Sequence, residues 1–305
     1  METRTFDYII IGAGPAGLAS AQYAARGGLS TVVIDASGVG GQVSQISDLE
    51  NYPGVYPALN GSFFMENMKL QAEAFGAEFE EATVSSIDKR GETFVVTTKK
   101  TVYEAPALCI ATGAIHTELG VPGEKEFAGR GVSYCAVCDG PFFADKKIFV
   151  VGGGDSACSE ATYLASLSKD VTIIHRRSSF RAQKAVVEKM RDAGVKPLYD
   201  TIVKEIKGDN VVTSIVIQNV VTGGVQEISA DAVFIFTGML PQTELVDMLP
   251  KDPAGYIITD ENMETSVPGL FAAGDVRSKP FRQVVTAVSD GAIAAHVASE
   301  RIRKA

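Results

Sequence analysis

Cysteine and histidine are scarce in this chain of 305 residues, which holds four cysteines and three histidines. A small secreted domain stabilised by several disulfides is therefore excluded, because such domains are rich in cysteine. A zinc site needs about four ligands at short spacings, and no histidine lies at such a spacing from the one Cys-x-x-Cys motif, Cys135 to Cys138. We expect no metal site and interpret this motif as a redox pair.

Positive charge is also in deficit, with 28 basic against 37 acidic side chains and a net charge of −9. An acidic chain lacks the basic surface that binds a nucleic-acid backbone. Long apolar runs are missing too, since no segment holds the roughly 18 unbroken apolar residues of a membrane span. The apolar N-terminal stretch follows Glu2 and Asp7 and is interrupted by glycines, unlike a signal peptide. We expect a cytoplasmic protein that binds neither nucleic acid nor membrane.

Glycine is abundant, with 30 residues that cluster without a period. The first cluster, Gly12-Ala13-Gly14-Pro15-Ala16-Gly17, follows an apolar strand at 6–11 and precedes a helix at 18–26. A second strand, at 31–34, ends at Asp35. This order is typical of a dinucleotide site, because glycines let the backbone approach a pyrophosphate, the helix N-terminus attracts it, and the acid binds a ribose diol. An ordinary glycine-rich turn is the alternative.

The same order recurs in the middle of the chain. A strand at 147–151 and a helix at 159–166 flank Gly152-Gly153-Gly154-Asp155-Ser156-Ala157. A second strand, at 170–174, ends in His175-Arg176-Arg177, with Arg181 following. Arginines in place of an acid suit the 2′-phosphate of NADP by charge and by paired hydrogen bonds, and a solvated basic loop is the alternative. Two such sites indicate a flavin and a nicotinamide, since hydride passes between these cofactors.

The redox motif Cys135-Ala136-Val137-Cys138 comes shortly before the second glycine turn. Its spacing permits a reversible disulfide, whereas a structural disulfide is the alternative that a cytoplasmic chain disfavours. Asp139 follows directly and is a candidate acid or base for thiol release, although a carboxylate here is also common on a solvated surface. The other cysteines, Cys109 in an apolar strand and Cys158 in a helix, are interpreted as core residues.

Motifs along nearly the whole chain resemble those of the bacterial low-molecular-weight thioredoxin reductases. Besides the glycine turns, the redox motif and the arginines, they are Gly40-Gly41-Gln42, Glu50-Asn51-Tyr52-Pro53-Gly54, Ala111-Thr112-Gly113-Ala114, Ala272-Ala273-Gly274-Asp275-Val276 and Arg282-Gln283. The resemblance implies a homodimeric flavoenzyme that passes electrons from NADPH through FAD and the Cys135–Cys138 disulfide to thioredoxin. The chain departs from the family's usual residues at Asp35, where glutamate is usual, and at Thr117 and Met239.

The resemblance also implies an α/β fold with two Rossmann-like domains. The NADPH domain, residues 115–242, is inserted in a discontinuous FAD domain made of residues 1–114 and 243–305. FAD would be held by Gly12, Gly14, Pro15, Ala16, Gly17, Asp35, Gly41, Gln42, Asn51, Thr112, Gly113, Gly274, Asp275, Arg282, Gln283 and Val284. NADPH would be held by Gly152, Gly153, Gly154, Asp155, Ser156, Ala157, His175, Arg176, Arg177 and Arg181.

Glycines at both domain junctions, Gly113 and Gly238, favour a hinge. The dithiol and the nicotinamide site belong to the same inserted domain, so one rotation would exchange them at the flavin and turn the dithiol to solvent. Phe142 and Phe143 follow the redox motif and are candidates for docking a partner, because aromatic side chains anchor interfaces; core packing is the alternative. Which thiol attacks the partner stays open.

Three other functions stay open. They are a ferredoxin-linked or flavin-linked relative that has lost NADPH, an NAD(P)H oxidase in which the Cys-x-x-Cys is idle, and a flavin-binding redox sensor without turnover. His175-Arg176-Arg177 argues against the first. Steady NADPH consumption that requires added thioredoxin separates thioredoxin reduction from all three.

Overall fold

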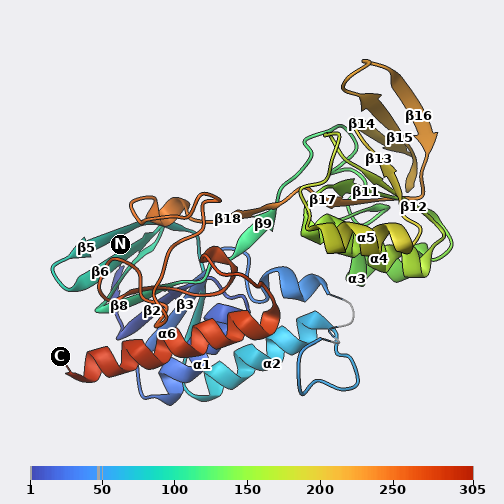
Figure 1. The fold of residues 1–305 in the computed structure, drawn as a ribbon. Helices are drawn as coiled ribbons and strands as arrows, with labels where there is room; N and C mark the ends of the chain where they lie inside the picture. Colours follow the sequence, from blue (N-terminus) through green and yellow to red (C-terminus); the bar gives the residue numbers. More distant parts are fainter. Residues whose placement is uncertain (1, 47–48, 50, 305) are drawn as a thin grey trace. The chain divides into compact units, whose positions relative to one another are not determined.

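The computed structural model describes residues 2–46, 49 and 51–304, and the chain divides into two units. Unit 1 contains residues 1–115 and 240–305, and unit 2 contains residues 116–239. The chain passes between them twice, through β9 (Ala114–His116) and β18 (Met239–Pro241), which pair with each other (Figure 1). The assignment of FAD to unit 1 and of NADPH to unit 2 stays a prediction.

The centre of unit 1 is a parallel five-stranded sheet in the order β19-β8-β2-β3-β4. β2 and β8 are buried along their whole length, as expected for apolar strands of a parallel sheet that is covered on both faces. β19, from the C-terminal part of the chain, pairs with β8, so both segments of unit 1 share one sheet. The strands are β2 (Tyr8–Ile11), β3 (Thr31–Asp35), β4 (Glu78–Glu81), β8 (Ala107–Ile110) and β19 (Leu270–Ala272).

Helices cover one face of this sheet and a smaller sheet covers the other (Figure 1). Tyr8 and Ile10 of β2 pack with the helices, whereas Ile9 and Ile11 pack with the smaller sheet, as the alternation of a strand requires. The helices are α1 (Pro15–Arg26), α2 (Gly61–Ala74) and α6 (Val284–Lys304), with the 3-10 turns η1 (Gly41–Gln45), η3 (Glu244–Val246) and η4 (Gly274–Val276). The smaller sheet has the order β1-β7-β6-β5 and contains β1 (Glu2–Thr5), β5 (Val84–Arg90), β6 (Thr93–Thr98) and β7 (Thr101–Ala105).

Unit 2 repeats this layering around a second parallel sheet, in the order β10-β17-β11-β12-β13. Ile148 and Val150 of β11 pack with helices, and Phe149 and Val151 pack with an antiparallel sheet on the other face. The parallel strands are β10 (Val132–Ser133), β11 (Lys147–Gly152), β12 (Asp170–Ile174), β13 (Lys196–Leu198) and β17 (Ala232–Phe236). The other elements are α3 (Ala136–Asp139), η2 (Gly140–Phe143), α4 (Asp155–Leu167), α5 (Lys184–Asp192), β14 (Thr201–Gly208), β15 (Val212–Asn219) and β16 (Val225–Ser229).

Both helices that follow the glycine turns begin earlier than the sequence predicts. α1 begins at Pro15 and α4 at Asp155, directly after Gly14 and Gly154. Proline favours the first helical position because its φ is already helical and its missing N–H needs no partner there. The predicted α/β class with two Rossmann-like sheets is confirmed. Within the described residues, no helix combines the length and apolar character that crossing a membrane requires.

Candidate redox and nucleotide sites

The first glycine turn joins β2 to α1 at the carboxyl end of the parallel sheet. A Cβ atom built on Gly12 would overlap the Ala111 carbonyl, and one built on Gly17 would overlap the Gly12 carbonyl. Gly14, the N-cap of α1, has open space instead, with no atom within 4 Å of a built Cβ. No side chain in the described part of the chain caps α1. Its first N–H groups and the space above Gly14 therefore suit a phosphate.

Asp35, at the end of β3, is fastened to this turn. Its Oδ2 accepts a hydrogen bond from the Ala13 N–H at 2.7 Å, and its Oδ1 accepts one from the Ser37 N–H at 2.7 Å. Each oxygen keeps a further lone pair for a ribose hydroxyl. A cavity of about 180 Å³ opens beside it, lined by the predicted Gly12, Asp35 and Thr112 and by Thr83, Gln242 and Leu245, which no motif had indicated.

Segments far apart in the sequence converge on the first turn of α1. A Cβ on Gly41 of η1 would lie 3.5 Å from Gly14 Cα, and one on Gly274 of η4 would lie 2.8 Å from Ala16 Cβ. Both glycines adopt positive φ, +55° and +81°, which glycine tolerates and other residues rarely adopt. The structure therefore brings the predicted Gly41 and Gly274 onto the first glycine turn.

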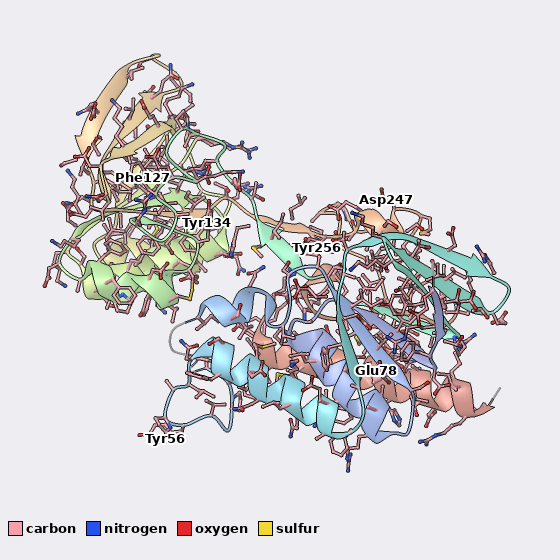
Figure 2. The ribbon with its side chains drawn as sticks, turned by 180° about the vertical axis from the view of Figure 1, so that it is seen from behind. Tyr56, Glu78, Phe127, Tyr134, Asp247 and Tyr256 are labelled. Atoms are coloured by element: carbon pink, nitrogen blue, oxygen red, sulfur yellow. A yellow bond between two sulfur atoms is a disulfide. The ribbon has the colours of Figure 1, made fainter. Side chains whose placement is uncertain are left out.

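Asp275 and Arg282 carry buried polar atoms, Oδ1 and Nε, that have no hydrogen-bond partner among the described residues. Burial raises the pKa of Asp275, and the positive charges of Lys279 and Arg282 oppose that shift. The Arg282 guanidinium stacks 3.7 Å from the ring centroid of Tyr256, which Figure 2 labels. Buried polar groups in native proteins are satisfied by some partner. The residues present therefore fit a polar ligand with hydroxyl groups, such as a dinucleotide, next to the first glycine turn.

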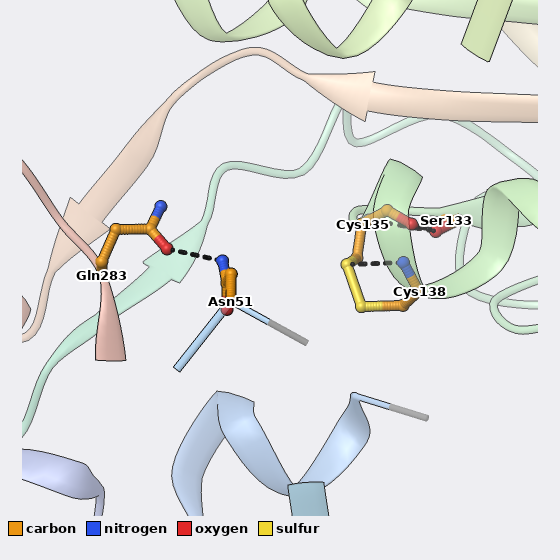
Figure 3. Close-up of a disulfide and its surroundings, with 5 residues drawn as sticks. All are labelled: Asn51, Ser133, Cys135, Cys138 and Gln283. Atoms are coloured by element: carbon orange, nitrogen blue, oxygen red, sulfur yellow. Dashed lines mark hydrogen bonds between the residues drawn. A yellow bond between two sulfur atoms is a disulfide. The ribbon is translucent and has the colours of Figure 1, made fainter. Parts of the chain in front are cut away.

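Asn51 and Gln283 are in contact, although they come from the two separate chain segments of unit 1. Asn51 Nδ2 donates a hydrogen bond to Gln283 Oε1 at 3.1 Å (Figure 3). Gln42 Nε2 donates to the Ala114 carbonyl. Glu50, which belongs to the same motif as Asn51, lies outside the described residues. Three of the predicted FAD residues thus take part in contacts that hold distant segments of unit 1 together.

Thr112 and Gly113 are bound to Gln242, the residue after β18. Thr112 Oγ1 donates to the Gln242 carbonyl at 2.6 Å, and Gln242 Nε2 donates to the Thr112 carbonyl at 2.6 Å. The Gln242 N–H donates to the Gly113 carbonyl at 3.0 Å. Gln242 is therefore a positioning residue for the two chain crossings. Val284, the remaining predicted residue here, is the first residue of α6.

The second glycine turn joins β11 to α4 and depends on close packing in the same way. A Cβ on Gly152 would lie 2.6 Å from Ala157 Cβ, and one on Gly153 would overlap the His175 ring. Gly154 is the N-cap of α4 and has no atom within 4 Å of a built Cβ. Among the described side chains none caps α4. This turn therefore also offers free N–H groups and space for a phosphate.

The basic residues after β12 divide into one buried and three exposed side chains. His175 is buried, burial lowers its pKa, and its Nε2 has no hydrogen-bond partner within the described chain. Arg176, Arg177 and Arg181 are exposed. Phe180 packs on the His175 ring with centroids 5.3 Å apart, and the Arg181 N–H donates to the Gly153 carbonyl at 2.8 Å. His175 thus supports the glycine turn from inside, while the arginines stay available to an anion.

Two acids on α4 differ in surroundings. Asp155, exposed in the first turn beside Ser156, accepts a hydrogen bond at Oδ1 from the Gln183 N–H at 2.7 Å and so fastens the basic loop. Glu160 was not predicted. Burial raises its pKa, and its Oε2 has no hydrogen-bond partner among the described residues. The sequence around Glu160 matches no motif. The burial of its carboxyl group therefore becomes visible only in the packing of α4.

Cys135 and Cys138 form a disulfide at the start of α3 (Figure 3). Cys135 is half-buried, whereas Cys138 is 7% exposed. The Cys138 N–H donates to Cys135 Sγ at 3.2 Å, so the backbone of α3 holds this sulfur at the start of the helix. Ser133 Oγ accepts the Cys135 N–H at 3.0 Å and so fixes the loop before the motif.

The residue before the motif, Tyr134, is tied to a buried carboxylate that the sequence did not indicate. Its hydroxyl donates to Glu124 Oε1 at 2.8 Å, and Glu124 is 1% exposed. Glu124 also accepts the N–H groups of Leu119 and Gly120 at 2.9 and 2.7 Å. Glu124 therefore fastens the redox loop to the segment that follows β9.

The residues after the motif separate into surface and core. Asp139 is half-buried at the end of α3, and its N–H donates to the Cys135 carbonyl at 3.2 Å. Phe142 is 73% exposed. Phe143 is half-buried and packs edge-on against Phe234, with centroids 6.0 Å apart. Phe142 alone therefore remains a docking candidate, because Phe143 belongs to the core of unit 2.

Cys109 and Cys158 are free, fully buried thiols, as predicted. Burial raises the pKa of Cys109 to about 12 and that of Cys158 to about 11. A thiol reacts as its thiolate, so both residues are inert near neutral pH.

Comparison with known proteins agrees with this geometry. A family model described as pyridine nucleotide-disulphide oxidoreductase matches residues 6–291. A protein named thioredoxin reductase from Treponema pallidum (strain Nichols) is 50% identical over 303 residues, which cover 99% of this chain and 98% of that protein. The chain belongs to the thioredoxin reductase family. Among solved thioredoxin reductases, that of Streptococcus pyogenes is 45% identical with a TM-score of 0.83, and the alignment covers 99% of each chain.

One solved structure similar to this chain carries the name of an electron donor. A structure named ferredoxin-flavin thioredoxin reductase, from Clostridium acetobutylicum, is 32% identical with a TM-score of 0.55 and is matched over 100% of both chains. Membership of the thioredoxin reductase family therefore leaves the electron donor to be argued from the residues of this chain.

Proposed function

We propose that this protein is an NADPH-dependent thioredoxin-disulfide reductase that binds FAD in unit 1 and NADPH in unit 2. Its family supports the coarser part of the proposal, a flavin, a pyridine nucleotide and a disulfide substrate. The observation that carries the proposal is the Cys135–Cys138 disulfide, which lies in the same unit as the second glycine turn and its exposed arginines. An oxidase would leave that disulfide without a role.

In the proposed reaction, NADPH, one proton and oxidised thioredoxin give NADP⁺ and the dithiol form of thioredoxin. Bound FAD would supply the conversion of a hydride into an electron pair that reduces the Cys135–Cys138 disulfide. One of the two resulting thiols attacks the disulfide of the partner, and the other resolves the mixed disulfide, which restores the Cys135–Cys138 bond. Asp139 directly follows Cys138 and would exchange a proton with the leaving thiol.

The remaining residues bind and orient. Gly14 and Gly154 leave space and free N–H groups for the two pyrophosphates. Asp35 accepts hydrogen bonds from the ribose of FAD, and Arg176 and Arg177 bind the 2′-phosphate that distinguishes NADPH from NADH. The exposed ring of Phe142, in η2 directly after α3, supports docking of a protein partner at the dithiol.

We also infer a rotation of the two units about the paired crossings β9 and β18, and assembly as a homodimer. Gly113 and Gly238 adopt positive φ, +68° and +140°, next to these strands, where glycine permits a large dihedral change. The homodimer rests on the family resemblance, and sedimentation of the purified protein measures it.

The deciding experiment is steady oxidation of NADPH with and without added thioredoxin. Cys135→Ser and Cys138→Ser should each abolish thioredoxin reduction, because one thiol cannot complete the exchange, while NADPH still bleaches the bound flavin. Cys158→Ala, a change at a buried thiol outside the exchange, serves as the control and should retain activity. Oxidation that proceeds equally fast without thioredoxin would indicate an oxidase, and reduction of thioredoxin by ferredoxin alone would indicate the ferredoxin-linked function.

A further inference from the structure

A cluster of four charged side chains includes Asp275 and contacts the backbone of the Gly274-Asp275 turn. It combines Asp275, Arg277 and Lys279 from the segment around η4 with Asp290 from α6. The side chains of Lys279 and Asp290 are 5% and 9% exposed. Charged groups are rarely buried so deeply unless they are paired. The cluster holds two cations and two anions, so its charges balance.

Asp290 is the anchor of this cluster. Its Oδ2 accepts a hydrogen bond from Lys279 Nζ at 3.0 Å and one from the Gly274 N–H at 3.1 Å. Arg277 Nη1 lies 3.4 Å from its Oδ1, while Arg277 Nε donates to Thr259 Oγ1 at 2.8 Å. One carboxylate on α6 therefore fixes the backbone of the turn and two cations beside it.

Lys279 lies between the two carboxylates. Its Nζ is 3.0 Å from Asp290 Oδ2 and 3.5 Å from Asp275 Oδ1, and it contacts Thr286 Oγ1 at 3.4 Å. The contacts with Asp290 and Thr286 are hydrogen bonds, and the contact with Asp275 is an ion pair. No other partner of Asp290 reaches Asp275 Oδ1, whose hydrogen-bonding capacity is unfilled within the described residues. Lys279 is thus the cation that links Asp275 to the anchor.

We propose that Lys279, held by Asp290, is a positioning residue of the flavin site that keeps the Asp275 carboxylate ionised and available to accept hydrogen bonds from the hydroxyl groups of the FAD polyol chain. The inference rests on the proposed binding of FAD by unit 1. It assigns a role to a residue that no motif of the sequence indicates. It also explains why a lysine is buried where a neutral side chain would avoid the cost of desolvation.

The charges around Asp275 predict what removal of Lys279 does. Asp275 is faced by Lys279, Arg282, Asp290 and Tyr256. Burial and the negative charge of Asp290 raise the pKa of Asp275, whereas Lys279 and Arg282 lower it. Without Lys279, Asp275 loses the nearer of its opposing cations while burial and Asp290 still act on it, so its pKa should rise further. A protonated Asp275 is a weaker acceptor, so FAD binding should become dependent on pH.

The experiment titrates FAD into apoprotein of the full-length chain and measures Kd by fluorescence between about pH 6 and pH 9. Wild-type affinity should stay nearly flat, because in this proposal Lys279 holds Asp275 as the carboxylate across that range. Lys279→Met should weaken FAD binding by about tenfold to a hundredfold at the acidic end, the effect of losing a hydrogen bond to an ionised acceptor. The loss should diminish as the pH rises through the raised pKa of Asp275, because the carboxylate ionises above that pKa.

Matched variants separate positioning from a structural role. Lys279→Arg keeps the charge and should restore a nearly flat profile. Lys69→Met removes a half-buried lysine of unit 1 that pairs with Glu73 at 3.1 Å, far from this cluster in sequence, and should leave FAD affinity unchanged. Lys279→Gln, which keeps N–H donors for Asp290 but no charge, should reproduce the pH dependence if Lys279→Met does not fold.

Two results would overturn the inference. One is wild-type affinity for FAD at every pH in the uncharged variants. The other is a loss of equal size at every pH, accompanied by a lower Tm of the apoprotein, which would show that Lys279 only stabilises the fold. Failure of the wild-type apoprotein to bind FAD at all would contradict the proposed function, and with it the role of Lys279 at a flavin site.

Discussion

Arg176 and Arg177 are exposed just after β12. We expect their guanidinium groups to bind the 2′-phosphate, which NADPH carries and NADH lacks. A hydrogen bond between charged groups contributes about 1.5–3 kcal/mol, and two neighbouring ones contribute less than their sum. A combined loss of about 3 kcal/mol corresponds to roughly a hundredfold in affinity. Replacing both arginines by alanine should therefore raise KM for NADPH roughly a hundredfold and leave KM for NADH nearly unchanged.

Steady-state kinetics with both nucleotides measures this preference. Lys184→Ala removes another exposed cation of unit 2, one that pairs with Glu188 on α5, and should change neither KM. An equal loss for NADPH and NADH in the double variant would mean that the arginines serve the loop structure. A wild-type preference for NADH would contradict the assignment of NADPH.

Replacement by alanine should affect two glycines of the first turn differently, lowering stability at Gly17 and FAD affinity at Gly14. Gly17→Ala places a Cβ onto the Gly12 carbonyl and should lower the free energy of unfolding by about 1–3 kcal/mol, as overpacking does. Gly14→Ala meets no atom within 4 Å and should leave the apoprotein as stable as wild type. It should weaken FAD binding, because the added methyl group occupies the space for the pyrophosphate.

Chemical denaturation of the two apoproteins measures the first effect, and FAD titration measures the second. Wild-type FAD affinity in Gly14→Ala would exclude this turn as the pyrophosphate site. Unchanged stability of Gly17→Ala would show that the contact between α1 and the turn relaxes without cost.

At the scale of elements, β8 and α4 bury the two cysteines that take no part in the disulfide. Burial raises their pKa values to about 12 and about 11, so both remain protonated at about pH 8. Iodoacetamide should therefore alkylate the half-buried Cys135 in the reduced, folded protein and leave Cys109 and Cys158 unlabelled. Mass spectrometry of the labelled peptides measures this, with fully labelled, unfolded protein as the control. Rapid labelling of Cys109 would mean that β8 opens readily.

Local sequence predicted the two glycine turns but not the residues at which the following helices begin. The glycine spacing predicted both nucleotide-type turns, because the contacts that demand glycine join residues a few positions apart, as between Gly12 and Gly17. The same spacing did not predict that α1 and α4 begin directly at the turn. Helix starts depend on capping, and both N-caps are glycines without a capping side chain in the described chain.

At the scale of the whole molecule, each unit has its own hydrophobic cores. The described core clusters of unit 1 contain no residue of unit 2, and the converse also holds. The Thr117 N–H donates to the Gly238 carbonyl at 3.0 Å, so these residues are close enough for a two-residue turn. Replacing residues 118–237 by Asn-Gly should therefore yield a folded unit 1 that binds FAD and does not reduce thioredoxin.

Circular dichroism and FAD titration of this shortened chain measure the outcome, with residues 116–239 expressed alone as its counterpart. Both fragments should unfold cooperatively. A shortened chain that stays unfolded with FAD present would show that unit 1 needs the inserted unit for stability, contrary to the independence of its cores.

The linear pattern of residues was sufficient for the two glycine turns between strand and helix, the Cys135–Cys138 disulfide, the buried Cys109 and the overall class of fold. Each of these depends on residues that are close in sequence, within one turn or one strand. The alternation of apolar residues and the spacing of glycines are therefore enough to predict them. The linear pattern did not decide between docking and core packing for Phe142 and Phe143. Adjacent residues in η2 face different surroundings, and only packing against Phe234 decides which of them is buried.

Other parts of the sites depend on which distant segments fold onto one another. The contact of Asn51 with Gln283, the approach of Gly274 to Ala16 and the placing of Lys279 against Asp290 carry no local period. They follow from the register of β19 on β8 and from the packing of α6 on α1, which bring the two ends of the chain together. Long-range packing decides which side chains from distant segments come into contact. The local spacing of residues in the sequence carries no information about these contacts.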